Sequence, residues 1–340
     1  MIFKTPKFWQ KINLLSLSLL PISLLYFIAY QIKKKFTKSY ISTKAIICIG
    51  NIIAGGSGKT PITIAITKII QKITREQQPN KDVAIITTGY GTKIKDSIFL
   101  KNTNEYSNIG DEAKILIKTA PIFIGKNRND SVKKAEKEDN LISLVLDDGM
   151  QSYNLHKDLQ INVIDSQIMF GNCLLIPAGP LRETIKSGLK KTDILISIGK
   201  LTAEQMANIN KYYRKDIIFA EITISNQEII TRKPTFAFAG IAYPNKFFNL
   251  LKANNCNLVE TKTFPDHYKY SQEELLKLIK TSKNNNWQII TTEKDWVKFP
   301  CDIQKTITPL LIEARFSKES ENLIRQKLEL IINSKLNKLT

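Results

Sequence analysis

The most constraining feature of this 340-residue sequence is the segment 48–61, which reads CIGNIIAGGSGKTP. The apolar residues of 44–49 predict a buried strand, and the apolar spacing that follows predicts a helix, so a glycine-rich turn joins the two. Glycines let backbone amides converge on phosphate oxygens, Lys59 can reach the β- and γ-phosphates, and Thr60 can hold Mg²⁺. The segment predicts a P-loop, because a turn that only links two elements does not explain Lys59 and Thr60.

The predicted nucleotide-binding residues all lie in this turn, although Ile53 stands where the common motif has glycine. They are Asn51, Gly55, Gly56, Ser57, Gly58, Lys59 and Thr60.

Two adjacent carboxylates end a second apolar strand, predicted over 141–146. Asp147 and Asp148 can hold Mg²⁺, or its water ligands, opposite Thr60. The alternative is that the two aspartates only cap a helix or bend the chain. The position behind a core strand favours a metal site formed by Thr60, Asp147 and Asp148.

The composition excludes some classes of protein and leaves others open. Fifty Lys and Arg against 31 Asp and Glu give a formal charge of +19, which attracts phospholipid headgroups, phosphorylated substrates or nucleic acid. No zinc-finger spacing, recognition helix or basic segment with interleaved aromatics is present, so we expect no nucleic acid partner. The four widely spaced cysteines predict reduced core residues without a metal cluster or disulfide framework.

The N-terminus carries an uncharged, leucine-rich segment from residue 12 to 32, flanked by lysines on both sides. Its length matches the roughly 20 residues that a membrane-spanning helix needs. Pro21, Asn13 and several serines leave a helix lying in the interface as an alternative. We therefore expect a membrane anchor over 1–35, with the catalytic part on the cytoplasmic side because a basic cluster follows the segment.

Strand-like and helix-like segments alternate through the rest of the chain, which predicts a parallel sheet with helices on both faces. The expected fold class is α/β, with a P-loop NTPase-like domain over 36–233 and a smaller α/β domain over 234–340. Segments 217–224 and 228–233 are expected to form an extended pair before the domain boundary. The segment 175–183 is too rich in Pro and Gly for a regular element.

Two further positions are candidates from their surroundings alone. Asp111 precedes a helical pattern, where it can be a catalytic carboxylate or simply an N-cap. His267 lies between Asp266 and Tyr268, where it can be functional or an ordinary loop histidine.

The sequence resembles the tetraacyldisaccharide 4′-kinase (lipid A 4′-kinase) family through nearly the whole chain, with the family's motifs in the same order. The motifs that carry the resemblance, besides the P-loop and the apolar N-terminal helix, are Gly89-Tyr90-Gly91, Gly110-Asp111-Glu112, Asp147-Asp148-Gly149-Met150-Gln151, Gly171-Asn172, the segment 177–183, Ala239-Gly240-Ile241-Ala242, Asp266-His267 and Thr292-Glu293-Lys294-Asp295.

The resemblance implies transfer of the γ-phosphate of ATP to the 4′-hydroxyl of a tetraacyldisaccharide 1-phosphate in lipid A biosynthesis. By analogy with the family, Asp111 and His267 form a dyad that takes the proton from this hydroxyl, while Lys59 and Mg²⁺ stabilise the transferred phosphoryl group. Because the dyad is split between the inferred domains, we expect the C-terminal domain to close over the active site.

The resemblance also assigns a substrate cleft, in which Arg182 offers a planar fork to a phosphate. An ordinary surface ion pair of Arg182 and Glu183 is the alternative. The expected substrate contacts are Glu112, Tyr90, Arg182, Glu183 and Asp266.

The implied partners are the acylated disaccharide and an anionic phospholipid surface, and the implied location is the cytoplasmic face of the inner membrane. An acylated substrate stays in the bilayer, because each buried CH₂ holds it there by about 0.8 kcal/mol.

Three positions depart from the family's usual pattern. Ile53 replaces a threonine, Thr88 an arginine and Ser152 a histidine. The proposed catalytic residues are all retained, so we expect activity, with altered substrate affinity as one consequence of the missing arginine.

A membrane-tethered P-loop NTPase switch is the main alternative function. A guanine-specific switch needs an Asn/Thr-Lys-x-Asp segment, whereas Lys294 and Asp295 are adjacent here. A soluble cofactor kinase is a third alternative, but it leaves the apolar N-terminus unexplained.

Overall fold

The computed structural model describes residues 6–56, 58–89, 92, 94, 96–102 and 109–337. The chain divides into two compact units. The large-sheet unit comprises residues 7–222 together with the C-terminal segment that starts at Ala314. The small-sheet unit comprises residues 223–313 with Pro6.

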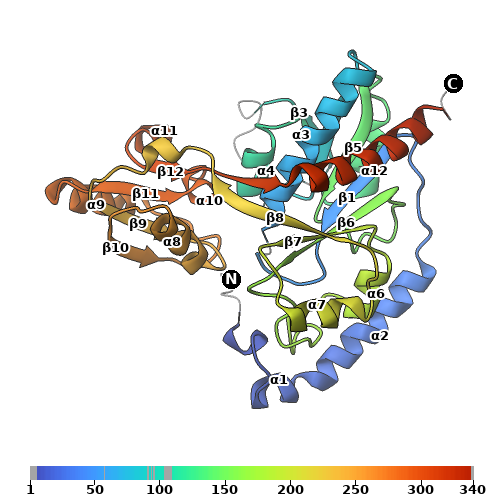
Figure 1. Ribbon diagram of the computed structural model, residues 1–340, viewed down its shortest axis with the longest axis horizontal. Coiled ribbons are helices and arrows are strands. Elements are labelled where there is room, and N and C mark those ends of the chain that lie inside the picture. The colour runs from blue at the N-terminus through green and yellow to red at the C-terminus, as the bar shows by residue number, and fades with distance from the viewer. Residues whose placement is uncertain are drawn as a thin grey trace. The chain divides into compact units, whose positions relative to one another are not determined.

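The large-sheet unit is built on a nine-stranded sheet in the order β13-β8-β7-β6-β1-β5-β2-β4-β3 (Figure 1). Its strands are β1 (Ala45–Gly50), β2 (Asp82–Thr87), β3 (Ile98–Leu100), β4 (Ile122–Ile124), β5 (Leu141–Asp147), β6 (Leu159–Asp165), β7 (Ile194–Ile198), β8 (Ile217–Ile224) and β13 (Ile312–Phe316). The strands from β8 through β4 in this order run parallel, and β3 pairs antiparallel with β4. The predicted α/β fold with a large, mostly parallel sheet is confirmed.

Helices cover both faces of this sheet. They are α3 (Lys59–Gln77), α4 (Asp111–Leu116), α5 (Arg128–Ala135), α6 (Ile185–Lys190), α7 (Ala203–Asn210) and α12 (Lys318–Leu336). The first apolar core joins the sheet to α3, α4 and α12, and the second joins it to α5, α6 and α7. In β1, Ile47 and Ile49 belong to the first core and Ile46 and Cys48 to the second, which is why the strand is an unbroken apolar run.

The small-sheet unit contains four parallel strands in the order β10-β9-β11-β12. Its elements are β9 (Thr235–Ala239), β10 (Leu258–Thr263), β11 (Gln288–Thr292), β12 (Thr308–Leu310), α8 (Pro244–Ala253), α9 (Gln272–Asn284), α10 (Glu293–Trp296), α11 (Cys301–Gln304) and the 3₁₀ helix η3 (Gln227–Ile229). The predicted extended pair of 217–224 and 228–233 is wrong, because β8 pairs in parallel with β7 and η3 begins the second segment.

The C-terminal helix α12 lies in the large-sheet unit, whereas the sequence interpretation assigned all of 234–340 to one domain. The reason is its apolar stripe: Ile324, Leu328 and Ile332 are fully buried in the same core as α3. The short strand β13, which precedes α12, is an edge strand of the large sheet.

The N-terminal apolar segment forms a 3₁₀ helix and two α-helices rather than one continuous helix. These are η1 (Lys7–Trp9), α1 (Leu14–Ser18) and α2 (Leu20–Phe36). Asn13 caps α1 with a capping box, and Pro21 lies in the first turn of α2. None of the helices that the structure describes is long and apolar enough to cross a bilayer. The predicted membrane helix stays a prediction.

The outer side of α1 and α2 is nevertheless apolar and exposed, with Leu14 86% and Leu25 67% exposed. The inner side is attached to the large-sheet unit by polar groups. The Ser23 hydroxyl donates to the Leu175 carbonyl (2.9 Å), and the Tyr26 hydroxyl donates to the Arg182 carbonyl (2.8 Å).

The prediction that all cysteines are core residues is only half right. Cys48 and Cys256 are buried, whereas Cys173 and Cys301 are exposed. Cys173 lies in a turn with a positive φ of 61°, and Cys301 begins the short helix α11, so neither lies on an inward-facing strand or helix stripe.

Candidate active site

The P-loop connects β1 to α3, as predicted. Gly58 has a φ of 72°, and a Cβ at this position would lie 2.6 Å from Ile198 Cδ1, so the turn requires glycine for conformation and for space. Among the residues that the structure describes, no side chain caps the start of α3, and the first amides of such a helix are groups that bind an anion. Lys59 begins α3 and donates from Nζ to Asn51 Oδ1 (3.2 Å).

The two carboxylates lie beside the P-loop because β1 and β5 are neighbours. Ile49 is paired in register with Asp147, so the chain leaves both strands at the same edge of the sheet. Thr63 of α3 donates a hydrogen bond from Oγ1 to Asp147 Oδ1 (3.1 Å). Burial, followed by the charges of Glu112 and Asp148, raises the pKa of Asp147 to about 7.

Asp148 is held ionised in the same site. Lys59 Nζ lies 3.4 Å from its Oδ1, and Arg182 Nη1 lies 2.9 Å from its Oδ2. Although burial acts in the opposite direction, Lys59 and Arg182 lower the pKa of Asp148 to about 2. The structure therefore joins Lys59, Asp148 and Arg182 into one charged cluster.

These groups fit a magnesium ion. A threonine hydroxyl and carboxylates are the hard oxygen ligands that Mg²⁺ prefers, and a cation bound beside the buried Asp147 would favour the ionised form of its carboxyl group. Among the described residues, no group of three or more His, Cys, Asp or Glu side chains is arranged to hold a metal by itself. A site of Thr60, Asp147 and Asp148 thus needs further ligands, such as phosphate oxygens.

The irregular segment 175–183 lies along the P-loop, which explains how Arg182 reaches the site. The Arg182 amide donates to the Ile52 carbonyl (2.8 Å), and the Ala54 amide donates to the Pro180 carbonyl (2.7 Å). Ile53, the departure from the family's threonine, is buried and forms an isolated antiparallel bridge with Leu181. Its side chain thus contributes to packing beneath the loop.

Glu183 is fully buried, which leaves its side chain no surface for a substrate in this structure. Its carboxylate forms an ion pair with Lys191 (2.7 Å) and accepts a hydrogen bond from Gln151 Nε2 (2.8 Å). Sequence reasoning assigned no role to Gln151 or Lys191. Gln151 ends the motif that begins with Asp147 and Asp148, but Lys191 carries no sequence signal beyond its charge.

Arg128 is a further residue that the sequence interpretation missed. It donates to the carbonyls of Asp147 (3.0 Å) and Asp148 (2.8 Å), and to the hydroxyl of Ser152 (3.0 Å). Arg128 therefore places a guanidinium against the backbone of the two aspartates, and its charge contributes to the low pKa of Asp148.

Asp111 is the first residue of α4, and the N-cap position belongs to Gly110, which has a φ of 83°. The alternative that Asp111 is only the N-cap is therefore not supported. Glu112 follows in the same first turn, and its charge contributes to the raised pKa of Asp147. This places Glu112 within electrostatic range of the predicted metal site.

The motifs of the small-sheet unit gather at one edge of its parallel sheet. His267 has a φ of 56°, its Nε2 lies 3.2 Å from Lys294 Nζ, and Lys294 lies 3.7 Å from Asp266. At the same edge, the fully buried Asp295 accepts hydrogen bonds from the amide of Gly240 (2.8 Å) and the hydroxyl of Thr292 (2.7 Å).

Asp111 lies in the large-sheet unit and His267 in the small-sheet unit, so their pairing stays a prediction. Tyr90 and Ser57 lie outside the described residues. The remaining predicted residues of the P-loop, Asp147, Asp148 and Arg182 lie around one edge of the large sheet.

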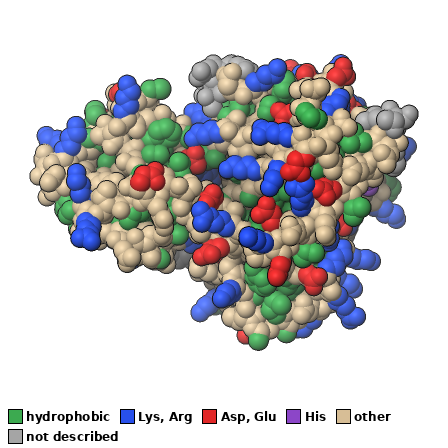
Figure 2. Space-filling model, turned by 45° about the horizontal axis from the view of Figure 1, so that its top comes forward, with side chains coloured by type: hydrophobic (Ala, Val, Ile, Leu, Met, Phe, Trp, Pro, Cys, Tyr) green, Lys and Arg blue, Asp and Glu red, His purple; other side chains and the backbone are tan. Residues whose placement is uncertain are grey.

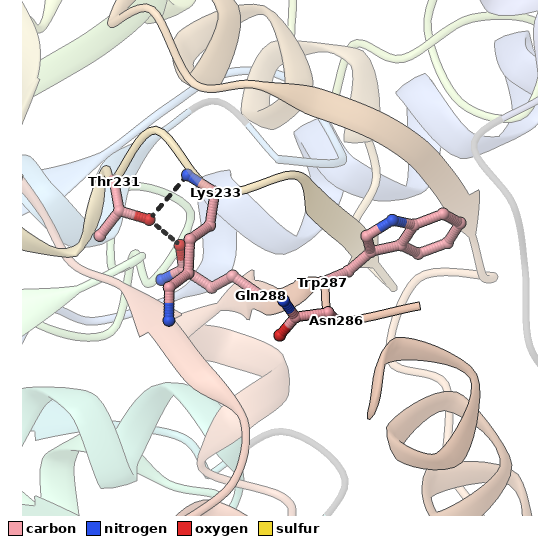
Figure 3. Close-up of a pocket in the computed structure, with 5 residues that line it drawn as sticks. All are labelled: Thr231, Lys233, Asn286, Trp287 and Gln288. Carbon is pink, nitrogen blue, oxygen red and sulfur yellow. Dashed lines mark hydrogen bonds between the residues drawn. The ribbon is translucent and has the colours of Figure 1, made fainter. Parts of the chain in front are cut away.

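A pocket of about 240 Å³ in the small-sheet unit contains none of the predicted site residues (Figure 3). It is lined by Thr231, Lys233, Asn286, Trp287 and Gln288. Lys and Arg side chains are spread over the face shown in Figure 2, with Asp and Glu between them. The charge on this face therefore does not single out one partner.

Three comparisons bear on this site. The family model described as tetraacyldisaccharide-1-P 4′-kinase (LpxK) matches residues 15–329. Tetraacyldisaccharide 4′-kinase of Rickettsia canadensis is 36% identical over 327 residues, which cover 95% of this chain and 96% of that protein. The enzyme of the same name from Rickettsia bellii is 34% identical over 323 residues, which cover 95% and 97%.

A solved structure has the same fold. The crystal structure of LpxK from Aquifex aeolicus in complex with ATP superposes with a TM-score of 0.71 at 22% sequence identity, covering 94% of this chain and 100% of that one.

Proposed function

The chain belongs to the tetraacyldisaccharide-1-P 4′-kinase family, and we propose that it transfers the γ-phosphate of ATP to the 4′-hydroxyl of a tetraacyldisaccharide 1-phosphate. This is the lipid A 4′-kinase activity for which the family is named. The observation that carries the proposal is the family match over residues 15–329, which includes the P-loop and the two carboxylates beside it.

The P-loop binds the nucleotide in this account. Its backbone amides and the start of α3 surround the phosphates, and Lys59 moves from Asp148 and Asn51 to the phosphate oxygens. Thr60, Asp147 and Asp148 would hold Mg²⁺, and the ion would neutralise charge that develops on the phosphoryl group. Arg182, 2.9 Å from Asp148, adds a second cation beside the phosphates.

Asp111 and His267 prepare the acceptor. Together they take the proton from the 4′-hydroxyl as it attacks, and the two units close to bring them to one substrate. The disaccharide is contacted by Glu112, which follows Asp111, by Asp266, which precedes His267, and by Tyr90 of the Gly89-Tyr90-Gly91 motif.

The acceptor reaches the site from a membrane surface. The exposed apolar side of α1 and α2 enters the bilayer interface, and the lysines that follow contact anionic headgroups. In this proposal the enzyme acts at the cytoplasmic face of the inner membrane, because an acylated substrate stays in the bilayer.

The test is transfer of ³²P from [γ-³²P]ATP to detergent-dispersed tetraacyldisaccharide 1-phosphate by the full chain. Asp111→Asn is expected to lose at least about 100-fold in kcat, because a positioned base contributes that much. Lys59→Ala is expected to lose at least about 100-fold as well, because the Lys59 cation stabilises the transferred phosphoryl group. Asp302→Asn, on the exposed part of α11, is the matched control. If wild-type protein hydrolyses ATP without labelling the lipid, it is an NTPase and the proposal is wrong.

Vesicle flotation tests the membrane contact. Leu14→Gln with Leu25→Gln is expected to lower the bound fraction, because the two leucines are exposed on the N-terminal helices. Leu330→Gln, which changes a leucine that is 70% exposed on α12, is the control and should bind like wild type.

A further inference from the structure

A buried ion pair lies one side chain away from the nucleotide site. Glu183 is fully buried and Lys191 is only 17% exposed. Lys191 donates to three acceptors, Glu183 Oε1 (2.7 Å), the Met150 carbonyl (2.9 Å) and the Tyr153 hydroxyl (3.3 Å). An ammonium group has three donors, so all the hydrogen bonds that Lys191 can donate are made and its position is fixed.

Gln151 connects this pair to the active site. Its Nε2 donates to Glu183 Oε1 (2.8 Å) and to the Asn51 carbonyl in the P-loop (3.1 Å), while its Oε1 accepts from Arg182 Nη1 (3.3 Å). Only one orientation of the amide satisfies these partners, because two of them accept and the third donates. A buried anion on one side of Gln151 therefore directs its oxygen toward the arginine on the other.

The N-terminal helix α2 is attached to the same cluster. The Tyr30 hydroxyl of α2 contacts the Tyr153 hydroxyl, which lies 3.4 Å from Glu183 Oε2. Burial raises the pKa of both tyrosines, so the hydroxyls keep their protons and remain donors. Tyr26, one turn earlier in α2, donates to the carbonyl of Arg182 itself.

We infer that Glu183, Lys191 and Gln151 are positioning residues that hold Arg182 against Asp148 beside the P-loop, and that Tyr30 makes the N-terminal helix part of this support. The inference rests on the proposed function, since Arg182 is the group that would act on phosphate. It changes the role expected for Glu183 from a substrate contact to a support of Arg182. It also means that α2 contributes to the geometry of the active site as well as to membrane contact.

The central variant is Gln151→Met, which keeps the side-chain length and removes both ends of the amide. We expect kcat to fall about 10-fold and KM for ATP to change less than about 2-fold, because an arginine that stabilises the transition state is released while the P-loop remains. Gln71→Met, which removes one hydrogen bond between α3 and the Thr119 carbonyl, is the matched control and should keep the wild-type kcat.

A second set of variants separates positioning from folding. Lys191→Met leaves a buried carboxylate unpaired, so we expect it to lower both kcat and the melting temperature. Adding Glu183→Gln removes the stranded charge and keeps an oxygen that accepts from Gln151, so the double variant should recover most of the lost kcat. Tyr30→Phe should lower kcat about 2- to 5-fold and leave vesicle binding unchanged. Tyr212→Phe, at an exposed tyrosine, is the control and should leave both kcat and vesicle binding unchanged.

The outcomes distinguish the two proposals. Wild-type protein that transfers no phosphate to the lipid overturns the proposed function. Wild-type transfer combined with an unchanged kcat for Gln151→Met overturns the positioning role alone. The positioning role is also overturned if Gln151→Met lowers both the melting temperature and kcat, and if Lys191→Met with Glu183→Gln recovers no kcat. The cluster would then only stabilise the fold.

Discussion

The ion pair of Lys59 and Asp148 leads to a specific prediction about nucleotide binding without metal. In the structure Lys59 Nζ lies 3.4 Å from Asp148 Oδ1, and the low pKa of Asp148, about 2, keeps the carboxylate charged at neutral pH. A metal-free triphosphate must take Lys59 from this carboxylate and then lie beside it. We therefore expect Asp148→Asn to bind metal-free ATP more tightly than wild type.

The magnitude follows from the distance. Two unit charges 3.4 Å apart interact with about 1.2 kcal/mol in water and about 5 kcal/mol at an effective dielectric constant of 20. The side chains of Lys59 and Asp148 are 13% and 28% exposed, so solvent screens part of this energy. Hydration of the carboxylate offsets part of the rest, and we expect a net gain of about 1–2 kcal/mol, or about 5- to 30-fold in Kd.

Isothermal titration calorimetry with ATP in excess EDTA measures this change. Asp193→Asn is the matched control, since Asp193 pairs with Lys215 at 3.7 Å near the surface, and its Kd should equal that of wild type. With Mg²⁺ present, Asp148→Asn should lose phosphotransfer, because a proposed metal ligand is removed. An equal or weaker affinity for metal-free ATP would refute the reasoning, since the carboxylate would then not compete with phosphate for Lys59.

Three further predictions concern packing, burial and the P-loop. Leu328 lies on the buried side of α12, and Leu328→Ala should lower the free energy of unfolding in urea by about 2.7–5 kcal/mol. Leu330→Ala, at an exposed position of the same helix, should lower it by less than about 0.5 kcal/mol, and equal losses would contradict the packing of α12. Burial lowers the pKa of Lys157 to about 8, below its unfolded value, so the protonated amine destabilises the fold and Lys157→Met should stabilise it by about 1–3 kcal/mol at pH 7. That advantage should shrink as the pH rises from 8 to above 10, and a pH-independent difference would count against it. Gly58→Ala should weaken ATP binding at least about 10-fold by calorimetry, because the new Cβ meets Ile198 in a left-handed turn, and unchanged binding would show that the loop tolerates it.

The core of the large sheet could be predicted because buried parallel strands are continuous apolar runs. β1 and β5 were expected within one residue of their bounds, and the P-loop between β1 and α3 is confirmed in position. By contrast, β10 was missed because its residues after Leu258 are exposed and mostly polar. A strand of this composition is held by backbone pairing with β9, which leaves little trace in side-chain pattern.

The supporting part of the candidate site could not be predicted for a different reason. Lys190 and Lys191 are adjacent and of one type, yet Lys190 is exposed while Lys191 pairs with the buried Glu183. Arg128, at the start of α5, contacts carbonyls of the segment at the end of β5, and Gln151, after β5, contacts the Asn51 carbonyl in the P-loop. The contacts of Arg128 and Gln151 link positions 19 and 100 residues apart, and one sequence holds no signal for them.

The central claim is that the P-loop directs a phosphate to a sugar hydroxyl, and the product of one reaction tests it most directly. Wild-type protein is incubated with ATP, Mg²⁺ and tetraacyldisaccharide 1-phosphate, and the lipid is examined by mass spectrometry and ³¹P NMR. We predict a bisphosphate with the new phosphate on the 4′-oxygen, absent with Lys59→Ala. Release of inorganic phosphate with the lipid unchanged, or a phosphate on any other oxygen, would contradict the account.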